Sequence, residues 1–240
     1  MNEEVDINDE GDLADEVRQR LALALDLDDL VEARRLAGSL HPYFGTVKIG
    51  LELYTAAGPD AVSLFSEAGF EVFCDLKLHD IPTTVERAAR VVGSLGVRWL
   101  TVHTSGGSAM LQAAVKGLAE GAESAGLNRP GVLGITILTS DEVASRNQLE
   151  ERCAVAADSG CEGIVCAATD LGVTDAFASR LTRVVAGLRL PGGETHDQSR
   201  IASPREALDG GADLLVIGRM VTASEDSVVA SEGLVDHLLG

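Results

Sequence analysis

The chain contains few lysines and few aromatic residues. Only three of its 240 residues are lysine, at positions 48, 77 and 116, and aromatic residues make up 3%. With a net charge of −19, the chain lacks the basic surface that nucleic acids and anionic membranes require of a partner. We therefore expect no nucleic acid and no membrane among its partners.

The chain also lacks long apolar runs. None approaches the roughly 18 residues of a membrane helix, and the first sixteen residues are acidic rather than basic and then apolar. We expect no membrane span and no signal peptide, and residues 1–16 are predicted to form a mobile acidic tail. The four cysteines (Cys74, Cys153, Cys161 and Cys166) have no metal-ligand spacing, so buried, reduced thiols in a cytoplasmic protein are expected.

Short apolar runs alternate with amphipathic segments along the rest of the chain. The eight apolar runs, which are predicted strands, are 21–26, 47–50, 70–75, 98–103, 132–138, 163–166, 183–187 and 214–218. The predicted helices are 30–40, 61–68, 84–95, 108–125, 141–159, 170–180, 204–208 and 224–239. This order predicts an α/β protein with a parallel sheet closed into a (β/α)8 TIM barrel. Because no Gly-, Pro- or Ser-rich linker divides it, residues 17–240 are expected to form one catalytic domain.

The stretch Asp75–Thr84 reads Asp-Leu-Lys-Leu-His-Asp-Ile-Pro-Thr-Thr and joins a predicted strand to a predicted helix. Pro82 requires the strand to end before it, and either of the two threonines that follow is predicted to cap the helix. Asp75 and Lys77 are two residues apart, which places both side chains on one face of the strand. Charges at that spacing between apolar neighbours are costly to bury unless paired, which favours a functional site over a solvated ion pair.

In a TIM barrel the active site forms at the carboxyl ends of the strands. The polar residues at the predicted ends are Asp26, Lys48, Asp75, Lys77, Asp80, His103, Thr139, Arg189 and Arg219. For His103, a structural imidazole explains its position as well as a catalytic one does. Arg189 and Arg219 lie in Gly-Leu-Arg and Gly-Arg segments after the last two strands, where this fold commonly binds phosphate. We favour an anion site there over an ordinary helix start.

In order along the chain, these motifs resemble the orotidine 5′-phosphate decarboxylase family over nearly all residues after the acidic start. The family's most specific motif, Asp-x-Lys-x-x-Asp-Ile-Pro-x-Thr, matches residues 75–84 without a gap. The resemblance continues in segments 23–26, 47–53, 102–107, 138–140, 197–200 and 216–219. The chain departs from the family in Ala-Gly-Leu-Arg at 186–189, where Pro-Gly-Ile-Arg is usual, and in a short span between Thr139 and Arg189. The helices after the fifth and sixth strands are therefore predicted to be trimmed.

The resemblance implies decarboxylation of orotidine 5′-monophosphate to uridine 5′-monophosphate, the last step of de novo pyrimidine biosynthesis, by a homodimer without cofactor or metal. It implies that Lys77 protonates C6 of the pyrimidine after carbon dioxide leaves. Lys48, Asp75 and Asp80 are then expected to complete an alternating array of charges, with Asp80 reaching into the neighbouring subunit's site.

The resemblance also implies a set of substrate contacts. It assigns the ribose hydroxyls to Asp26 and Lys48, the pyrimidine to Thr139, and the phosphate to Arg189, Gln198, Gly218 and Arg219. The remaining expected contacts belong to the central motif and its strand: Asp75, Leu76, Lys77, Leu78, His79, Asp80, Ile81, Pro82, Thr83 and Thr84.

Two other functions remain open. The first is a magnesium-dependent sugar-phosphate decarboxylase or aldolase on the same barrel, against which residues 81–84 and the Asp197-Gln198 segment argue. The second is a catalytically silent barrel that binds a nucleotide as a sensor or an assembly part. A silent site has no reason to retain Lys48, Asp75, Lys77 and Asp80 together.

Overall fold

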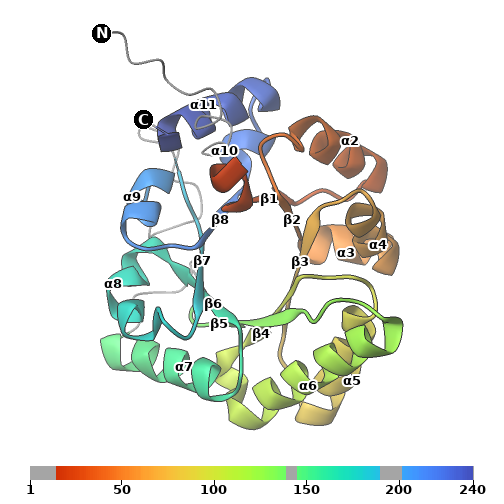
Figure 1. Ribbon diagram of the computed structural model, residues 1–240, viewed down its shortest axis with the longest axis vertical. Coiled ribbons are helices and arrows are strands. Elements are labelled where there is room, and N and C mark those ends of the chain that lie inside the picture. Colours follow the sequence, from red (N-terminus) through yellow and green to blue (C-terminus); the bar gives the residue numbers. More distant parts are fainter. Residues whose placement is uncertain (1–14, 139–144, 190–201, 240) are drawn as a thin grey trace, which may run out of the picture.

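The computed structural model describes residues 15–138, 145–189 and 202–239, and within them eight parallel strands close into a barrel in chain order (Figure 1). The strands are β1 (Leu21–Leu25), β2 (Thr46–Ile49), β3 (Glu71–Leu78), β4 (Trp99–His103), β5 (Gly131–Ile135), β6 (Gly163–Ala167), β7 (Thr182–Ala186) and β8 (Leu214–Ile217). β8 closes the sheet against β1, with Leu21 opposite Leu215. The (β/α)8 barrel predicted from the sequence is confirmed.

Helices surround the barrel on its outer side (Figure 1). They are α2 (Leu30–Leu40), α3 (Leu51–Ala57), α4 (Pro59–Glu67), α5 (Pro82–Gly93), α6 (Gly107–Ala125), α7 (Arg146–Asp158), α8 (Leu171–Thr174), α9 (Pro204–Asp209), α10 (Arg219–Thr222) and α11 (Ser227–Leu239). Within the described ranges, no helix combines the length and the apolar character that a membrane span needs. Most of the acidic start, residues 1–14, lies outside the described residues, so its predicted mobility stays a prediction.

Three local predictions were wrong in detail. β3 continues to Leu78 instead of ending at Asp75, because the chain bulges there before it leaves the sheet. α5 begins at Pro82, with Ile81 as its N-cap and no side-chain cap from either threonine. Proline suits this position because its fixed φ matches the helix and its missing N–H would have no partner in the first turn. The segment 170–180 contains the four-residue helix α8 between 3-10 turns instead of one helix.

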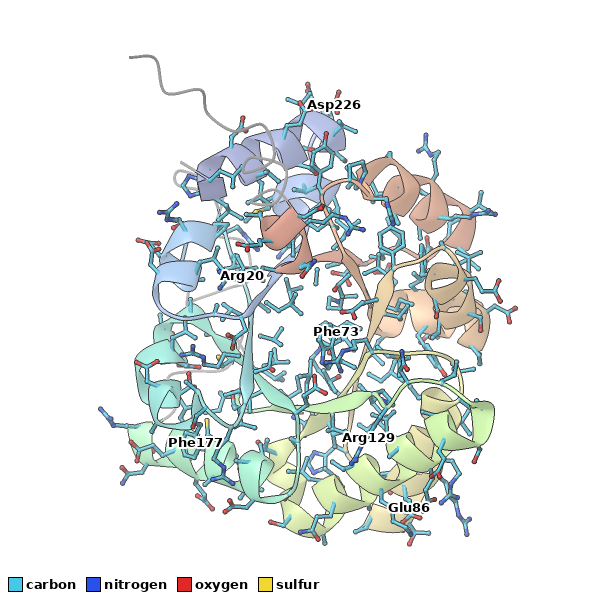
Figure 2. The ribbon with its side chains drawn as sticks, viewed as in Figure 1. Arg20, Phe73, Glu86, Arg129, Phe177 and Asp226 are labelled. Atoms are coloured by element: carbon cyan, nitrogen blue, oxygen red, sulfur yellow. The ribbon has the colours of Figure 1, made fainter. Side chains whose placement is uncertain are left out.

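Two apolar layers follow from the alternation of side chains along the strands. Residues that point outward, such as Leu23, Val47 and Leu100, pack against the helices. Residues that point inward fill the barrel: Ala22, Ala24, Phe73, Trp99, Leu133, Val184, Leu214 and Val216. Figure 2 places Phe73 in this interior. The four cysteines are buried and free, as the sequence predicts, and burial raises the pKa of the Cys74 thiol to about 12.

A polar cluster lies at the amino end of the barrel. The Arg98 guanidinium donates hydrogen bonds to both carboxylate oxygens of Glu162 and lies 4.5 Å from the centre of the Trp99 ring. The Trp99 indole N–H donates to the same carboxylate over 2.9 Å. Gly131 leaves the necessary room, since a Cβ there would collide with the Glu162 side chain. This cluster ties β4 to β6 across β5, at the end of the barrel away from the predicted active site.

Glu162→Gln is expected to lower the free energy of unfolding by about 1–2 kcal/mol at neutral pH, because charge-assisted hydrogen bonds are lost from a partly exposed carboxylate. Burial raises the pKa of the Glu162 carboxyl, but the hydrogen bonds from Arg98 and Trp99 outweigh it and hold the pKa below 4.5. The stabilisation is therefore complete above about pH 4.5 and is lost as the pH falls through the folded-state pKa.

Urea denaturation of both proteins at neutral and acidic pH measures this difference. Glu150→Gln is the matched control, because Glu150 forms an exposed pair with Arg146 within α7 and should change stability by less than about 0.5 kcal/mol. A difference for Glu162→Gln that stays constant, or grows, on acidification contradicts the pairing.

α5 and α6 pack more closely than ordinary side chains allow. A Cβ at Gly117 would collide with the carbonyl oxygen of Glu86, and one at Gly121 would collide with that of Arg90. A Cβ at Gly93 would likewise meet the carbonyl oxygen of Leu118. The backbones of the two helices are therefore in close contact at these three points, which joins the β3–α5 unit to the β4–α6 unit.

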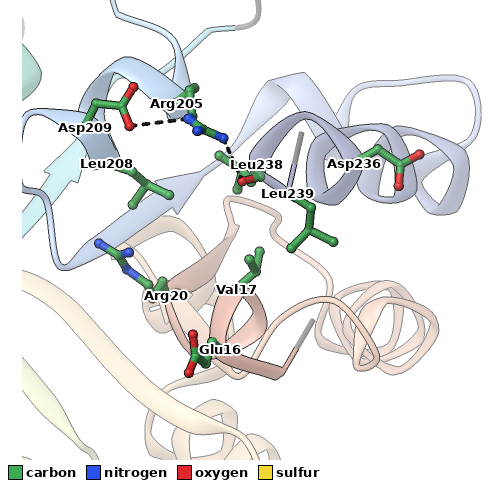
Figure 3. A pocket seen from close by; sticks show the side chains of 9 residues that line it. All are labelled: Glu16, Val17, Arg20, Arg205, Leu208, Asp209, Asp236, Leu238 and Leu239. Atoms are coloured by element: carbon green, nitrogen blue, oxygen red, sulfur yellow. Dashed lines mark hydrogen bonds and ion pairs between the residues drawn. The ribbon is translucent and has the colours of Figure 1, made fainter. Parts of the chain in front are cut away.

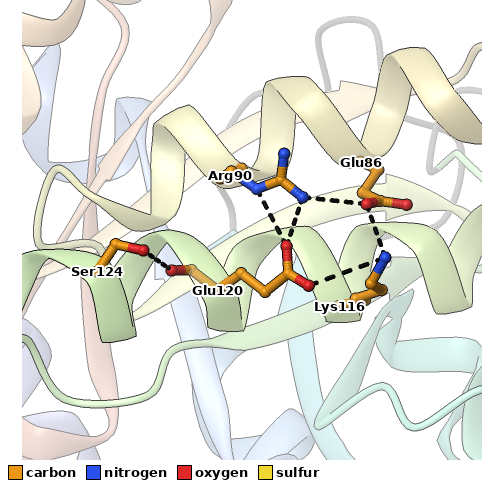
Figure 4. A network of polar contacts seen from close by, with 5 residues as sticks. All are labelled: Glu86, Arg90, Lys116, Glu120 and Ser124. Carbon is orange, nitrogen blue, oxygen red and sulfur yellow. Dashed lines mark hydrogen bonds and ion pairs between the residues drawn. The ribbon is translucent and has the colours of Figure 1, made fainter.

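A network of charges covers the outer side of this contact (Figure 4). Arg90 donates to Glu86 and to Glu120, while the Lys116 ammonium lies 2.9 Å from Glu86 Oε1 and 3.8 Å from Glu120 Oε1. Each cation bridges both helices. These hydrogen bonds hold the pKa of the Glu86 carboxyl below its ordinary value.

Candidate active site

The first three strands place four charged side chains together at the carboxyl end of the barrel. Asp26 follows β1, Lys48 lies in β2, and Asp75 and Lys77 lie in β3. The Lys48 ammonium nitrogen is 3.1 Å from Asp26 Oδ1 and 3.5 Å from Asp75 Oδ2. The Lys77 ammonium nitrogen is 2.7 Å from the same Asp75 Oδ2. One carboxylate oxygen is therefore shared by two ammonium groups.

This array is most buried at its centre. The side chains of Lys48 and Asp75 are each 10% exposed, whereas those of Lys77 and Asp26 are 32% and 60% exposed. Burial raises the pKa of the Asp75 carboxyl, but the Lys48 and Lys77 ammonium groups and the hydrogen bonds from Lys77 and Thr101 outweigh it. The pKa therefore lies below the ordinary value, and Asp75 is ionised at neutral pH.

Asp26 and Lys48 approach each other beside Gly50, the single residue between β2 and α3. A Cβ at Gly50 would lie 3.0 Å from Asp26 Oδ1 and 3.2 Å from the Lys48 ammonium nitrogen. Gly50 is also the N-cap of α3. The glycine thus leaves space for the ion pair where the chain turns out of β2.

A bulge in β3 directs the Lys77 side chain back toward Asp75. Cys74 pairs with Leu100 and Leu78 pairs with Val102, so residues 75–77 lie opposite Thr101 alone. Lys77 adopts the left-handed conformation, with φ 49°, which is uncommon for a residue other than glycine. The sequence predicted that Asp75 and Lys77 share a face by regular alternation. Their side chains do converge, but through this irregular backbone.

A cavity of about 110 Å³ opens beside the array. Its wall is formed by Lys48, Phe73, Asp75, Lys77, Ile135, Ile137, Leu138, Val165, Cys166, Ala186 and Val216. Charges on one side thus face apolar side chains on the other. An apolar wall limits water and strengthens the electrostatic effect of the ammonium groups on any molecule bound there.

The rest of the central motif lies on the rim and not in the array. Residues 79–84 are exposed, and Asp80 accepts a hydrogen bond from the Ile81 N–H over 2.6 Å. Among the described residues, Asp80 forms no ion pair with Lys48 or Lys77. The His79 ring lies 5.5 Å from the His103 ring. Leu76 and Leu78 pack against the core between sheet and helices and do not line the cavity.

The predicted phosphate residues that the structure describes follow two neighbouring strands. β7 and β8 pair through Val184 and Leu214, Arg189 follows β7, and Gly218 and Arg219 follow β8. Gly218 is the N-cap of α10, which Arg219 begins. Thr139 and Gln198, the other two predicted contacts of pyrimidine and phosphate, lie outside the described residues.

A larger cavity, about 780 Å³, lies away from this chemistry (Figure 3). It is formed where the carboxyl ends of α9 and α11 approach Arg20, just before β1. Its arginines are engaged: Arg205 pairs with Asp209 and donates to the Leu238 carbonyl, and Arg20 donates to the Ala212 carbonyl. Strands begin at this end of the barrel, so the cavity is at the opposite end from the charged array.

Sequence reasoning missed Thr101. It lies in β4, is fully buried, and hydrogen-bonds to both Asp75 and Lys77. The only indication of this role in the sequence was a hydroxyl at an inward position of a largely apolar predicted strand. Across residues 15–138, 145–189 and 202–239, no group of three His, Cys, Asp or Glu side chains is placed to hold a metal ion.

Comparison with known proteins identifies the family. The orotidine 5′-phosphate decarboxylase of Moorella thermoacetica is 41% identical over 235 residues, which cover 92% of each chain. The one from Halorhodospira halophila is 38% identical over 91% of this chain and 95% of its own. The crystal structure of the Lactobacillus acidophilus enzyme of that name superposes with a TM-score of 0.79 at 30% identity, covering 92% of this chain and all of the other. The family model that matches residues 19–234 is described as "Orotidine 5'-phosphate decarboxylase / HUMPS family", and the chain belongs to this family.

Proposed function

We propose that the chain decarboxylates orotidine 5′-monophosphate to uridine 5′-monophosphate, the last step of de novo pyrimidine biosynthesis, with Lys77 as the proton donor. The observation that carries the proposal is the pair of ammonium groups on one buried carboxylate oxygen, 2.7 Å and 3.5 Å away, beside an apolar cavity. Two relatives that are at least 38% identical to this chain over about nine-tenths of its length are named orotidine 5′-phosphate decarboxylase.

The residues fit the chemistry of this reaction. When the bond from C6 to the carboxylate breaks, carbon dioxide leaves and the electron pair stays on C6, where no π system can accept it. A fixed ammonium beside C6 stabilises that charge and then transfers its proton to form the C6–H bond. Lysine suits this role and arginine does not, because arginine keeps its proton at all accessible pH values.

Asp75 fixes the two ammonium groups. Its Oδ2 accepts from Lys77 and lies close to Lys48, so the positive charges are in place before substrate binds. Such preorganised charge costs no rearrangement during the reaction. Water then returns the proton that Lys77 has given up.

The remaining contacts in the proposal bind parts of the substrate that are remote from the reacting carbon. Asp26 and Lys48 bind ribose hydroxyls, Thr139 binds the pyrimidine, and the phosphate lies against Arg189, Gln198, Gly218 and Arg219. Arg189 and Arg219 follow adjacent strands, which supports a common anion. Binding energy from the remote phosphate can then serve orientation at C6.

We propose further that the enzyme is a cytoplasmic homodimer that shares its sites and has no nucleic-acid partner. In one protomer, Asp80 is exposed and bonds only its own backbone neighbour among the described residues. Ile81 beside it is 66% exposed, so this part of the rim is accessible to a partner subunit. Asp80 then completes the charge array of the partner subunit.

Adding the protein to orotidine 5′-monophosphate should cause loss of the substrate's ultraviolet absorbance, with or without prior exhaustive chelation. The proposed chemistry is carried by side chains, so removing divalent cations should leave the rate unchanged. The measurement is the initial rate of absorbance loss before chelation, after chelation, and after adding back magnesium.

Three results are distinguishable. Activity that returns only with magnesium favours the sugar-phosphate alternative. Binding of uridine 5′-monophosphate by calorimetry without any absorbance loss favours a silent nucleotide-binding barrel. A protein that neither binds nor turns over the nucleotide contradicts the proposed function altogether.

A further inference from the structure

We infer that Thr101 is a positioning residue for this decarboxylation, because its hydroxyl orients both the Asp75 carboxylate and the Lys77 backbone. The inference rests on the proposed function and adds a residue outside the central motif. The Thr101 hydroxyl donates to Asp75 Oδ1 over 2.9 Å and accepts from the Lys77 N–H over 2.8 Å. It therefore touches the two residues whose side chains form the central ion pair.

The first part of the role concerns the carboxylate. Asp75 has one oxygen turned to Thr101 and the other turned to the lysines. Rotation of an aspartate about its last torsion is soft, with two broad minima. The hydroxyl fixes that rotation, so that a single oxygen remains for both ammonium groups. Without it, the carboxylate can turn and present both oxygens to Lys48 and Lys77.

The second part concerns the backbone. Residues 75–77 bulge opposite Thr101, and Lys77 has a left-handed φ of 49°. A left-handed backbone is sterically unfavourable for a residue other than glycine and persists only where its surroundings hold it. The hydrogen bond from the Lys77 N–H to the Thr101 hydroxyl holds this conformation, which directs the lysine side chain toward the cavity.

A purely structural role does not explain the residue. Thr101 is 0% exposed and occupies an inward position of β4, where most side chains that fill the barrel are apolar. Valine has nearly the same shape and avoids the cost of burying a hydroxyl. Both hydrogen bonds to the bulge would, however, be lost. The presence of the hydroxyl is therefore explained by the two hydrogen bonds that fix the geometry of the Asp75–Lys77 ion pair.

The expected result for Thr101→Val is a fall in kcat of about 10- to 100-fold with KM changed by less than about threefold, because misplacement of a reacting group by about 1 Å can cost up to about 10²-fold. The contacts proposed for ribose and phosphate remain in place. The acid limb of the pH profile of kcat should also move to higher pH, because Asp75 loses a hydrogen bond that favours its ionised form.

Thr101→Ser, which keeps the hydroxyl, should retain kcat within a few-fold. Thr174→Val is the matched control. Thr174 is also fully buried and donates its hydroxyl hydrogen bond to a carbonyl, that of Leu171, but it lies in α8 far along the chain from the array. It should change neither kcat nor the pH profile. If Thr101→Val does not fold, Thr101→Ser and Thr101→Ala differ by the hydroxyl alone, and the serine variant should be faster by about 10-fold or more.

Two outcomes overturn the inference while the wild-type protein is active, and so leave the proposed function intact. One is a folded valine variant with kcat within about threefold of wild type and the same pH profile. The other is a serine variant as slow as the valine variant, or no faster than the alanine variant. An inactive wild-type protein instead removes the proposed function.

Discussion

Lys77→Ala is expected to reduce kcat by at least about 10²–10⁴-fold, the range typical for loss of a general acid. The variant removes both the proton that C6 receives and one of the two charges on Asp75 Oδ2. The fold should survive, since the Lys77 side chain is about a third exposed and Lys48 still compensates the buried Asp75. The measurements are steady-state rates and a thermal unfolding curve for each protein.

The scarcity of lysine provides a matched control. Lys116→Ala makes the same substitution on α6, where the ammonium bonds Glu86 and lies outside the cavity, so its kcat should equal that of wild type. Lys77→Arg separates charge from proton transfer, because arginine retains the charge but does not release a proton. It should be nearly as slow as Lys77→Ala.

A Lys77→Ala variant that keeps more than about a hundredth of the wild-type rate contradicts the assignment of the proton donor. A fast Lys77→Arg variant also contradicts the assignment of Lys77 as the proton donor. In that case the role of Lys77 would be electrostatic, and another group would donate the proton to C6. A Lys77→Ala variant that fails to fold is recognised by its unfolding curve and is replaced by Lys77→Met, which keeps most of the side-chain volume.

Mixing two inactive variants, Lys77→Ala and Asp80→Ala, is expected to restore activity. If Asp80 serves the partner's site, a mixed dimer has one site with both defects and one with neither. With random reassortment, about half of the dimers are mixed, and one of the two sites in each mixed dimer is intact. For a two-fold, isologous interface this gives roughly a quarter of the wild-type activity per site. The measurement is the rate after mixing, with subunit exchange followed by mass.

The negative control mixes Lys77→Ala with Lys48→Ala. Both lysines contact Asp75 of their own protomer, so every site of the mixed dimer carries one defect and no activity should return. Exchange without rescue in the first mixture places Asp80 in its own subunit's site and contradicts the shared-site proposal. Rescue in the control mixture contradicts the placement of both lysines in one site.

The periodic part of the fold could be predicted from the sequence, because an apolar run is a local property. Strand β1 and helix α2 were predicted to within a residue of their observed bounds. Short helices were missed: α3 and α10 each follow a strand directly and contain too few turns to show a helical period. The α5 start was misjudged because proline and threonine both favour helix starts, and proline took the first helical position.

The array itself was predicted in part. Asp26, Lys48, Asp75 and Lys77 were each recognised at strand ends, and they do meet. The bulge was not predictable, since it depends on how β3 pairs with β4 and not on either strand alone. Thr101 was missed for the same reason, because its partners are 24 and 26 positions away. Thr139 and Gln198 lie outside the described residues and stay predictions.

The close contact between α5 and α6 reverses an ordinary rule of mutational tolerance. Within a helix, alanine is normally more stable than glycine by about 1 kcal/mol, so Gly117 and Gly121 look like easy targets for stabilisation. Here the methyl group would meet a carbonyl oxygen of the facing helix, and the two helices would have to separate. Because these helices follow β3 and β4, separation would be transmitted to the strands that carry Lys77 and Thr101. The helical layer of this barrel is therefore not uniformly free to vary: substitution of these two buried glycines is restricted because it would displace the strands that carry the active site.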